Sequence, residues 1–151
     1  QGIELGLQGE VTPWWHVYGG FAHIDAEVTQ AVSTGTAANP AAVIPAGNKL
    51  ALSPENTFSL WNRFDLPCNW GGGIGVIRQS EAFASITNAV RLPAFTRVDG
   101  AVYYTFNGGR SRLALNVENL GDREYYPTAD GDNNISPGSP RAARLTYTHR
   151  F

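Results

Sequence analysis

The residues of this sequence best suited to chemistry are three histidines, His16, His23 and His149. His16 and His23 are seven positions apart in one predicted strand, so their side chains point to opposite faces and cannot share a metal ion within one chain. A catalytic histidine also needs a carboxylate or a hydroxyl beside it on the same face. The sequence indicates no such neighbour, and the G-x-S-x-G motif of hydrolases is absent. We therefore expect structural histidines, no catalytic residue and no enzyme activity.

A second candidate is the run Asp130-x-Asp132-x-Asn134, which is similar to the start of a calcium-binding loop. Such a loop requires glycine at its sixth position and glutamate at its twelfth, where this chain has Ile135 and Arg141. We therefore expect a solvated loop and no resident metal.

The glycine run from Gly71 to Gly75 is not a dinucleotide fingerprint, because Arg78 stands where the final glycine is needed and no helix follows. It predicts a strand whose small residues let another segment approach closely. The single cysteine, Cys68, excludes an internal disulfide. No cofactor is therefore expected.

The composition favours a β-rich protein with a large apolar contact surface. The formal net charge is −2, only 16% of the 151 residues are charged, 11% are aromatic and 17 are glycine. This balance gives no electrostatic case for binding nucleic acid. No run of 18 apolar residues occurs, but a membrane-spanning strand needs only about 9–11 residues with alternating apolar side chains. The chain has no methionine and no signal peptide, so an export signal would lie upstream of Gln1.

Alternation of apolar and polar residues predicts about seven strands and no helix. In the first strand, Ile3, Leu5 and Leu7 alternate with polar residues such as Glu4 and Gln8. The predicted strands cover residues 3–11, 14–25, 56–66, 70–79, 95–106, 110–119 and 141–151.

The connections between these strands alternate strictly between short and long. Short turns are predicted at 12–13, 67–69 and 107–109, where Asn107-Gly108 is a strong hairpin signal. Long loops are predicted at 29–48, 81–93 and 120–139. Outer-membrane barrels have short periplasmic turns and long extracellular loops, so the pattern favours a transmembrane barrel. A soluble antiparallel sandwich or a lipocalin-like binding barrel is the alternative.

The C-terminal strand strengthens the membrane interpretation. Leu145, Tyr147, His149 and the terminal Phe151 share one face. This pattern resembles the signal that the outer-membrane barrel-assembly machinery recognises, although an ordinary amphipathic edge strand is the alternative. His149 departs from the signal, which usually has an apolar residue there, but a neutral histidine near the membrane interface is tolerable.

Several segments in order resemble the C-terminal part of TonB-dependent siderophore receptors. They are GIELG at 2–6, FAHIDAEV at 21–28, FSLW at 58–61, LALNVENL at 113–120, DREYY at 122–126 and PGSPR at 137–141. The loop at 126–136 is most similar to the catecholate or a related subgroup. The resemblance implies an all-β, antiparallel, 22-stranded barrel, of which residues 1–151 would form about the last seven strands, with the plug domain and earlier strands absent.

The resemblance further implies a bacterial outer-membrane receptor that imports a ferric siderophore with energy from TonB. TonB would act through the absent plug region, and the other partners would be the lipid bilayer and the barrel-assembly machinery, with no nucleic acid. The iron(III)–siderophore complex would be cargo. A passive porin-like barrel without a plug is the alternative.

Within this interpretation, Tyr125 and Tyr126 are candidate contacts for an aromatic siderophore, unless they belong to the aromatic girdle of the barrel. Charged residues on the inner face are expected to pair with each other or with the plug; they are Arg97, Asp99, Arg112, Glu118, Arg144 and Arg150. With two open sheet edges, the isolated piece is expected to be insoluble without detergent.

Overall fold

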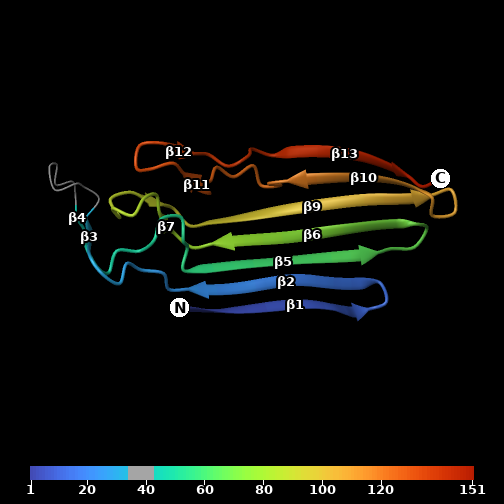
Figure 1. Ribbon diagram of the computed structural model, residues 1–151. Coiled ribbons are helices and arrows are strands. Elements are labelled where there is room, and N and C mark those ends of the chain that lie inside the picture. Colours follow the sequence, from blue (N-terminus) through green and yellow to red (C-terminus); the bar gives the residue numbers. More distant parts are fainter. Residues whose placement is uncertain (34–42) are drawn as a thin grey trace.

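A computed structural model describes residues 1–33 and 43–151 of the chain as one antiparallel sheet with three groups of loops at one end. The middle of the predicted loop at 29–48 lies outside the described residues. The seven strands of the sheet lie side by side in chain order (Figure 1). They are β1 (Gly2–Thr12), β2 (Trp15–Ile24), β5 (Asn56–Asp65), β6 (Trp70–Gln79), β9 (Phe95–Phe106), β10 (Ser111–Glu118) and β13 (Ala142–His149).

The predicted strands are confirmed, most of them to within one or two residues at each end. Six remaining strands of two residues each form small ladders within the long loops, which the sequence pattern did not predict. They are β3 (Val32–Ser33), β4 (Val43–Ile44), β7 (Ala82–Phe83), β8 (Arg91–Leu92), β11 (Thr128–Ala129) and β12 (Ile135–Ser136). Among the described residues, no helix is long and apolar enough to cross a membrane.

The short turns all lie at one end of the sheet, and the long loops lie at the other (Figure 1). The turn between β9 and β10 holds Asn107, Gly108 and Gly109, all with positive φ. Asparagine and glycine tolerate this left-handed conformation better than other residues do, which explains the tight reversal. Cys68 and Asn69 also have positive φ, in the turn between β5 and β6, where Cys68 is free and exposed.

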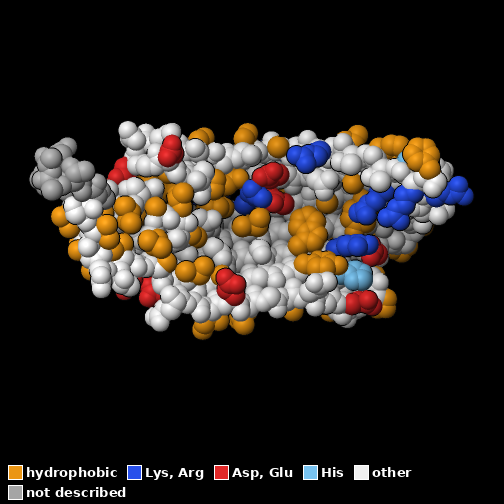
Figure 2. Space-filling view, in the orientation of Figure 1, with side chains coloured by type: hydrophobic (Ala, Val, Ile, Leu, Met, Phe, Trp, Pro, Cys, Tyr) orange, Lys and Arg blue, Asp and Glu red, His pale blue; other side chains and the backbone are white. Residues whose placement is uncertain are grey.

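The strand register gives the sheet two chemically different faces. Leu5 pairs with Phe21 and Phe21 with Phe58, so these apolar side chains share what we call the outer face. On the same face Leu115 lies opposite Val102 and Leu145. All six of these side chains are exposed although they share one face, and a continuous exposed apolar surface of this kind marks a contact with a membrane or another protein. The opposite, inner face is hollowed and carries charged side chains (Figure 2).

The buried apolar residues lie mainly in the loops and not in the sheet. Val28, Ile44, Ala84 and Leu92 are buried there, and Phe95 joins them from the start of β9. A single-layer sheet has no second layer to pack against, so its apolar residues remain on the surface. The loops instead bury apolar residues against each other, which gives the loop end of the sheet a small core of its own.

Glycines on β6 make room for large side chains on the inner face. A Cβ atom at Gly73 or Gly75 would lie 2.4 or 2.3 Å from the Trp61 ring, and one at Gly71 would lie 2.0 Å from the Tyr103 ring. The predicted close approach at this glycine run is therefore confirmed, and the approaching groups are aromatic rings of the neighbouring strands β5 and β9.

Candidate functional site

The inner face holds an ion-pair cluster at the base of the outer loops. The guanidinium of Arg97 on β9 donates hydrogen bonds to Asp99 at 2.9 Å and to Glu118 on β10 at 2.6 Å. The side chains of Arg97 and Asp99 are only 19% and 20% exposed. The prediction that opposite charges pair within this wall is confirmed for these three residues, which share one face because of the period-2 alternation.

Asn119 connects this cluster to the loop between β10 and β13. It is almost fully buried, and its backbone N–H donates to Asp99 at 2.8 Å. Its side-chain amide donates to the carbonyls of Arg123 at 2.8 Å and Ser139 at 3.1 Å, and its Oδ1 accepts from the Arg123 N–H at 2.9 Å. The side chain of this one buried asparagine thus hydrogen-bonds backbone groups at both ends of the loop, which explains its place after the LALNVE strand.

The two tyrosines that the sequence singled out differ in position. Tyr125 is 6% exposed; its ring lies 4.7 Å from that of Phe95, and its hydroxyl accepts a hydrogen bond from Arg97 at 2.9 Å. A Cβ atom at Gly138 would clash with the Tyr125 ring, so the loop closes directly over it. Tyr125 therefore anchors this loop and presents little of its ring to a ligand.

Tyr126 is only half-buried, and its hydroxyl donates to the carboxylate of Glu124. The hydrogen bond and the negative charge of Glu124 raise the pKa of the Tyr126 hydroxyl above its ordinary value of 10.0. Because Tyr126 is half-buried and Tyr125 is buried, the ring of Tyr126 is the more accessible to a ligand. That Tyr125 and Tyr126 contact a ligand stays a prediction.

A second polar network lies at the turn end of the inner face, and sequence reasoning missed it. His16 on β2 lies 3.2 Å from the carboxylate of Asp65 on β5, which also accepts from Arg63 at 2.9 Å. Arg63 in turn donates to the hydroxyl of Tyr103 at 3.1 Å. The expectation that no carboxylate neighbours a histidine on this face was therefore wrong. Only the register of β2 on β5, across a long loop, brings the pair together.

The carboxylate of this histidine–carboxylate pair also binds a guanidinium. Asp65 is already bound to Arg63, and among the described residues no serine, threonine or cysteine hydroxyl or thiol is hydrogen-bonded to His16. A nucleophile within hydrogen-bond reach of the base is the geometric signature of such catalysis. The network instead fixes Arg63 and Tyr103 on the inner face.

Aromatic rings form a band across the outer face at the turn end. Ring contacts with centroids 4.9–6.5 Å apart form two groups, one joining the start of β2 to β5 and the other running from β6 and β9 to β13 and the C-terminus. The members of this aromatic band are Trp14, Trp15, Phe64, Trp70, Tyr104, Phe106, Tyr147, His149 and Phe151. Such a girdle marks the membrane interface of transmembrane barrels.

The structure accounts for His149, the polar residue of the C-terminal face. Its Nδ1 atom lies 2.9 Å from the hydroxyl of Ser111, which has no exposed surface. Asn107 donates to the same hydroxyl at 3.0 Å. The imidazole of His149 is itself exposed, and its hydrogen bond satisfies the buried Ser111 hydroxyl, which gives a polar residue a role at this position. The role of Leu145, Tyr147, His149 and Phe151 as an assembly signal stays a prediction.

The outer loops are held to one another by side-chain hydrogen bonds. Asn88 accepts from the Lys49 N–H at 2.8 Å and donates to the Lys49 carbonyl at 2.9 Å, joining the β2–β5 loop to the β6–β9 loop. Thr87 donates to Asp132 at 2.7 Å, joining the latter to the β10–β13 loop. Asp132, part of the motif with similarity to a calcium loop, is thus a loop–loop contact. Across 1–33 and 43–151, no cluster of three or more acidic, histidine or cysteine residues could hold a metal ion.

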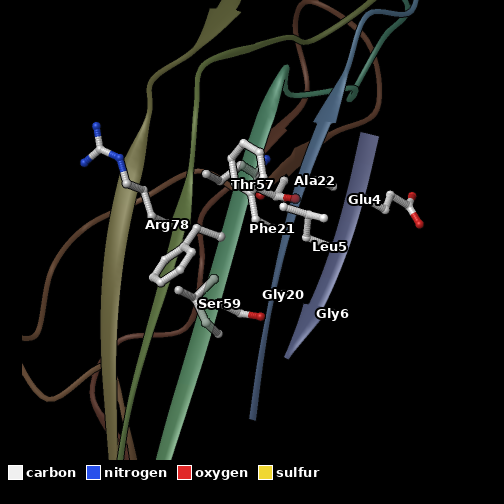
Figure 3. A pocket seen from close by; sticks show the side chains of 12 residues that line it. Glu4, Leu5, Gly6, Gly20, Phe21, Ala22, Thr57, Ser59 and Arg78 are labelled. Carbon is white, nitrogen blue, oxygen red and sulfur yellow. The ribbon is translucent and has the colours of Figure 1, made fainter. Parts of the chain in front are cut away.

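A hollow of about 570 Å³ lies over β1, β2, β5 and β6 (Figure 3). In this view Leu5 and Phe21 lie beside each other while Glu4 points away, as alternation on a strand requires. Only two ionisable residues line the hollow, Glu4 and Arg78. It therefore offers no convergent polar groups, and we assign it no chemistry.

A one-layer wall with an exposed apolar outer face, an aromatic band and a charged inner face defines a class of protein, the transmembrane β-barrel. Residues 1–120 match the family model described as TonB dependent receptor-like, beta-barrel. The chain belongs to this family, of whose barrel it forms a segment.

Related proteins extend this assignment over the whole chain. The chain is 26% identical to the probable TonB-dependent siderophore receptor PiuA of Acinetobacter baumannii, over 99% of this chain and 20% of that protein. The crystal structure of PiuA matches with a TM-score of 0.89 at 25% identity, over 98% of this chain and 21% of that chain.

Two further relatives differ in what their names say they bind. The catecholate siderophore receptor Fiu of Escherichia coli is 29% identical over 100% of this chain and 19% of its own length. The metal-pseudopaline receptor CntO of Pseudomonas aeruginosa is also 29% identical, over 100% of this chain and 20% of its own length. The chain thus spans about a fifth of the length of the curated relatives it matches.

Proposed function

We propose that this chain is part of the barrel wall of a bacterial outer-membrane receptor that imports a ferric siderophore with energy from TonB. The observation that carries the proposal is a sheet with one exposed apolar face and one charged face, in a chain that belongs to the TonB-dependent receptor family. Relatives of the chain are named as siderophore receptors. The outer face, with Leu5 and Leu145 exposed, suits lipid, whereas the inner face suits a lumen filled with water and protein.

The orientation of the wall follows from its two ends. Short turns of transmembrane barrels face the periplasm and long loops face the outside of the cell. The connected loops between β2 and β5, β6 and β9, and β10 and β13 would then surround the entrance. A plug domain, encoded upstream of Gln1, would fill the lumen and contact TonB. The ligand would bind to the loops, and Tyr126 is the accessible aromatic residue among the two candidates.

Transport by such a receptor requires differential binding and no covalent chemistry. Ligand binding would shift the population of plug conformations, which TonB then exploits. The wall contributes a fixed lumen, because Arg97 and Asn119 hold the loop base and the His16–Asp65 network holds the turn end. This proposal assigns the protein no enzyme activity.

The proposal is tested by iron uptake in a strain that lacks the gene and carries the full-length receptor on a plasmid. Radiolabelled iron should accumulate when a catecholate siderophore carries it, and should not accumulate when the gene for TonB is deleted. Because one relative is named for a metal–pseudopaline complex, zinc and nickel chelates belong in the same panel. Uptake that persists without TonB would support a passive porin instead, and uptake of none of these complexes would refute the proposal.

Tyr126 offers a sharper test of the ligand site. Replacing Tyr126 with Ala should weaken binding of the imported complex, whereas Tyr126→Phe keeps the ring and should retain most of it, because stacking needs no hydroxyl. The affinity is measured by fluorescence quenching in the purified full-length receptor. Equal affinity for all three proteins would remove Tyr126 from the site.

A further inference from the structure

Two of the three outer loops are joined through their backbones. The Leu52 N–H of the β2–β5 loop donates to the Phe83 carbonyl of the β6–β9 loop at 2.9 Å, and Ala51 pairs with Phe83 in a β-bridge. The Asn48 side chain donates to the Ile86 carbonyl at 2.8 Å. The two loops therefore share part of one hydrogen-bonded backbone.

Both of these loops also bury apolar side chains. The buried residues are Ile44, Ala82, Ala84 and Leu92. Segments with buried apolar contacts open locally only at a high free-energy cost. We call the joined parts of the two loops, residues 43–52 and 82–92, the loop block, and we expect this block to behave as one body.

The far part of the third loop, between β10 and β13, is held in a different way. Between Pro127 and Pro137 the chain turns back on itself as the short ladder of β11 on β12, at the loop end of the sheet (Figure 1). We call residues 127–137 the tip. None of them is buried, and Ile135 is 38% exposed. A segment that buries no apolar side chain can open at low cost.

One side-chain hydrogen bond connects the tip to the loop block within the described part of the chain. The Thr87 hydroxyl donates to Oδ2 of Asp132 at 2.7 Å, and we call this contact the latch. A threonine hydroxyl has one proton, so the Ser85 hydroxyl, 2.7 Å from that of Thr87, must donate to it. The loop block thus orients Thr87 toward the tip.

The latch is weak because its acceptor is only partly satisfied. The other carboxylate oxygen of Asp132, Oδ1, is buried and accepts no hydrogen bond from any described residue. A buried acceptor without a partner loses free energy relative to water, and opening of the tip returns this oxygen to solvent. The gain from the Thr87 hydrogen bond is therefore partly cancelled in the closed position.

We propose that the tip opens and closes as a strap against the rigid loop block, and that the latch sets the balance between the two positions. The base of the loop stays closed, because the Gly138 N–H donates to the carbonyl of the buried Tyr125 at 2.7 Å. Tyr126 directly precedes the tip, so the movement would change the surroundings of this candidate ligand contact. The proposal concerns the motion of the loops and goes beyond the proposed function.

The test measures distances by pulsed electron paramagnetic resonance in the full-length receptor, reconstituted in lipid bilayers with its native cysteines replaced. One pair of spin labels, at Ala46 and Ala89, reports on the loop block. A second pair, at Ala89 and Asn133, spans the latch. All three positions are exposed, so the labels should not disturb the packing. We expect one distance for the first pair, and for the second pair a short distance that matches the structure and a longer one.

The substitution Thr87→Val removes the hydroxyl and keeps the shape of the side chain. It should raise the ratio of long to short distances for the second pair about two- to twelvefold, the effect of losing one hydrogen bond. The matched control Thr87→Ser keeps the hydroxyl and should leave the ratio unchanged. The distance of the first pair should be the same in all three proteins.

Three results would overturn the proposal. A single short distance for the second pair in all three proteins would show that the tip does not open. A ratio that does not rise in Thr87→Val would remove the latch. Movement of the first pair together with the second would show that the three loops open as one body. The measurement uses neither ligand nor TonB, so a failure of the proposed function in iron uptake would be distinguishable from a failure here.

Discussion

The hydrogen bonds of Arg97 offer a quantitative test of how the outer loops are held. Replacing Arg97 with Met keeps much of the apolar stem and removes the contacts to Asp99, Glu118 and Tyr125. The loss leaves two carboxylates without their cation at a site where Arg97 and Asp99 are about four-fifths buried. Breaking a fully buried ion pair costs about 3–5 kcal/mol, so partial exposure reduces the expected loss to about 2–3 kcal/mol.

The loss should be local and measurable by hydrogen exchange in the full-length receptor. The Gly138 N–H donates to the Tyr125 carbonyl at 2.7 Å, and the Asn119 N–H donates to Asp99 at 2.8 Å. If these amides exchange through opening of the loop, a loss of 2–3 kcal/mol accelerates their exchange by about 30- to 140-fold.

An exposed ion pair provides the control for this experiment. The side chains of Arg91 and Glu81 are 59% and 57% exposed, so Arg91→Met should change the exchange of its own loop by less than about fivefold. Equal effects of the two substitutions, or unchanged exchange at Gly138 and Asn119 in Arg97→Met, would refute the claim that Arg97 fastens the loop.

Three further predictions concern packing, the C-terminal strand and pH. Gly75→Ala places a Cβ atom 2.3 Å from the Trp61 ring and should lower the free energy of unfolding by about 1–3 kcal/mol. Gly9→Ala, whose Cβ atom would meet nothing within 4 Å, should leave the free energy of unfolding unchanged. Thermal unfolding of the full-length receptor compares the two variants, and equal melting temperatures would contradict this account of the packing. Ser111→Ala removes the hydroxyl that His149 binds and should lower the free energy of unfolding of the refolded receptor by about 0.5–1.5 kcal/mol, the net value of a hydrogen bond whose remaining partner is exposed. Ser59→Ala, at an exposed position, is the neutral control. The Lys49 ammonium, through its hydrogen bond, lowers the pKa of Asp25 below 3.8, and Asp25 raises that of Lys49 above 10.5. The Asp25–Lys49 contact therefore contributes fully to the stability of the folded protein at neutral pH. The contribution is lost below pH 3.8, as pH falls through the lowered Asp25 pKa, and above pH 10.5, as pH rises through the raised Lys49 pKa. Carbon NMR of the Asp25 carboxyl should titrate below 3.8 and return toward that value in Lys49→Ala; identical midpoints would disprove the coupling.

Much of the fold could be predicted because the two faces of a single sheet appear in the sequence as an alternation of apolar and polar residues along each strand. Leu113 and Leu115 alternate with Arg112 and Asn116, and this alternation fixes both the strand and its faces without knowledge of any partner strand. The turn at Asn107 and Gly108 follows from the backbone conformations that these residues tolerate.

The candidate site was less predictable because it depends on which strands lie next to each other. His16 and Asp65 are 49 positions apart and meet only through the β2–β5 register, so no local pattern indicates the pair. Tyr125 looked like a surface aromatic residue because it lies in a polar loop. Its burial depends on Gly138, thirteen residues further along, which allows the chain to close over the ring.

The central claim, that the two faces of this wall contact lipid and lumen, is tested most directly by spin labels along β10. In the full-length receptor, with Cys68 replaced by Ser and reconstituted in lipid bilayers, single labels are placed at each position from 112 to 117. Labels at Leu113, Leu115 and Val117 should collide with oxygen dissolved in the lipid, whereas labels at Arg112, Ala114 and Asn116 should not. An accessibility to oxygen that does not alternate, or equal collision of both sets with a water-soluble nickel complex, would contradict the account.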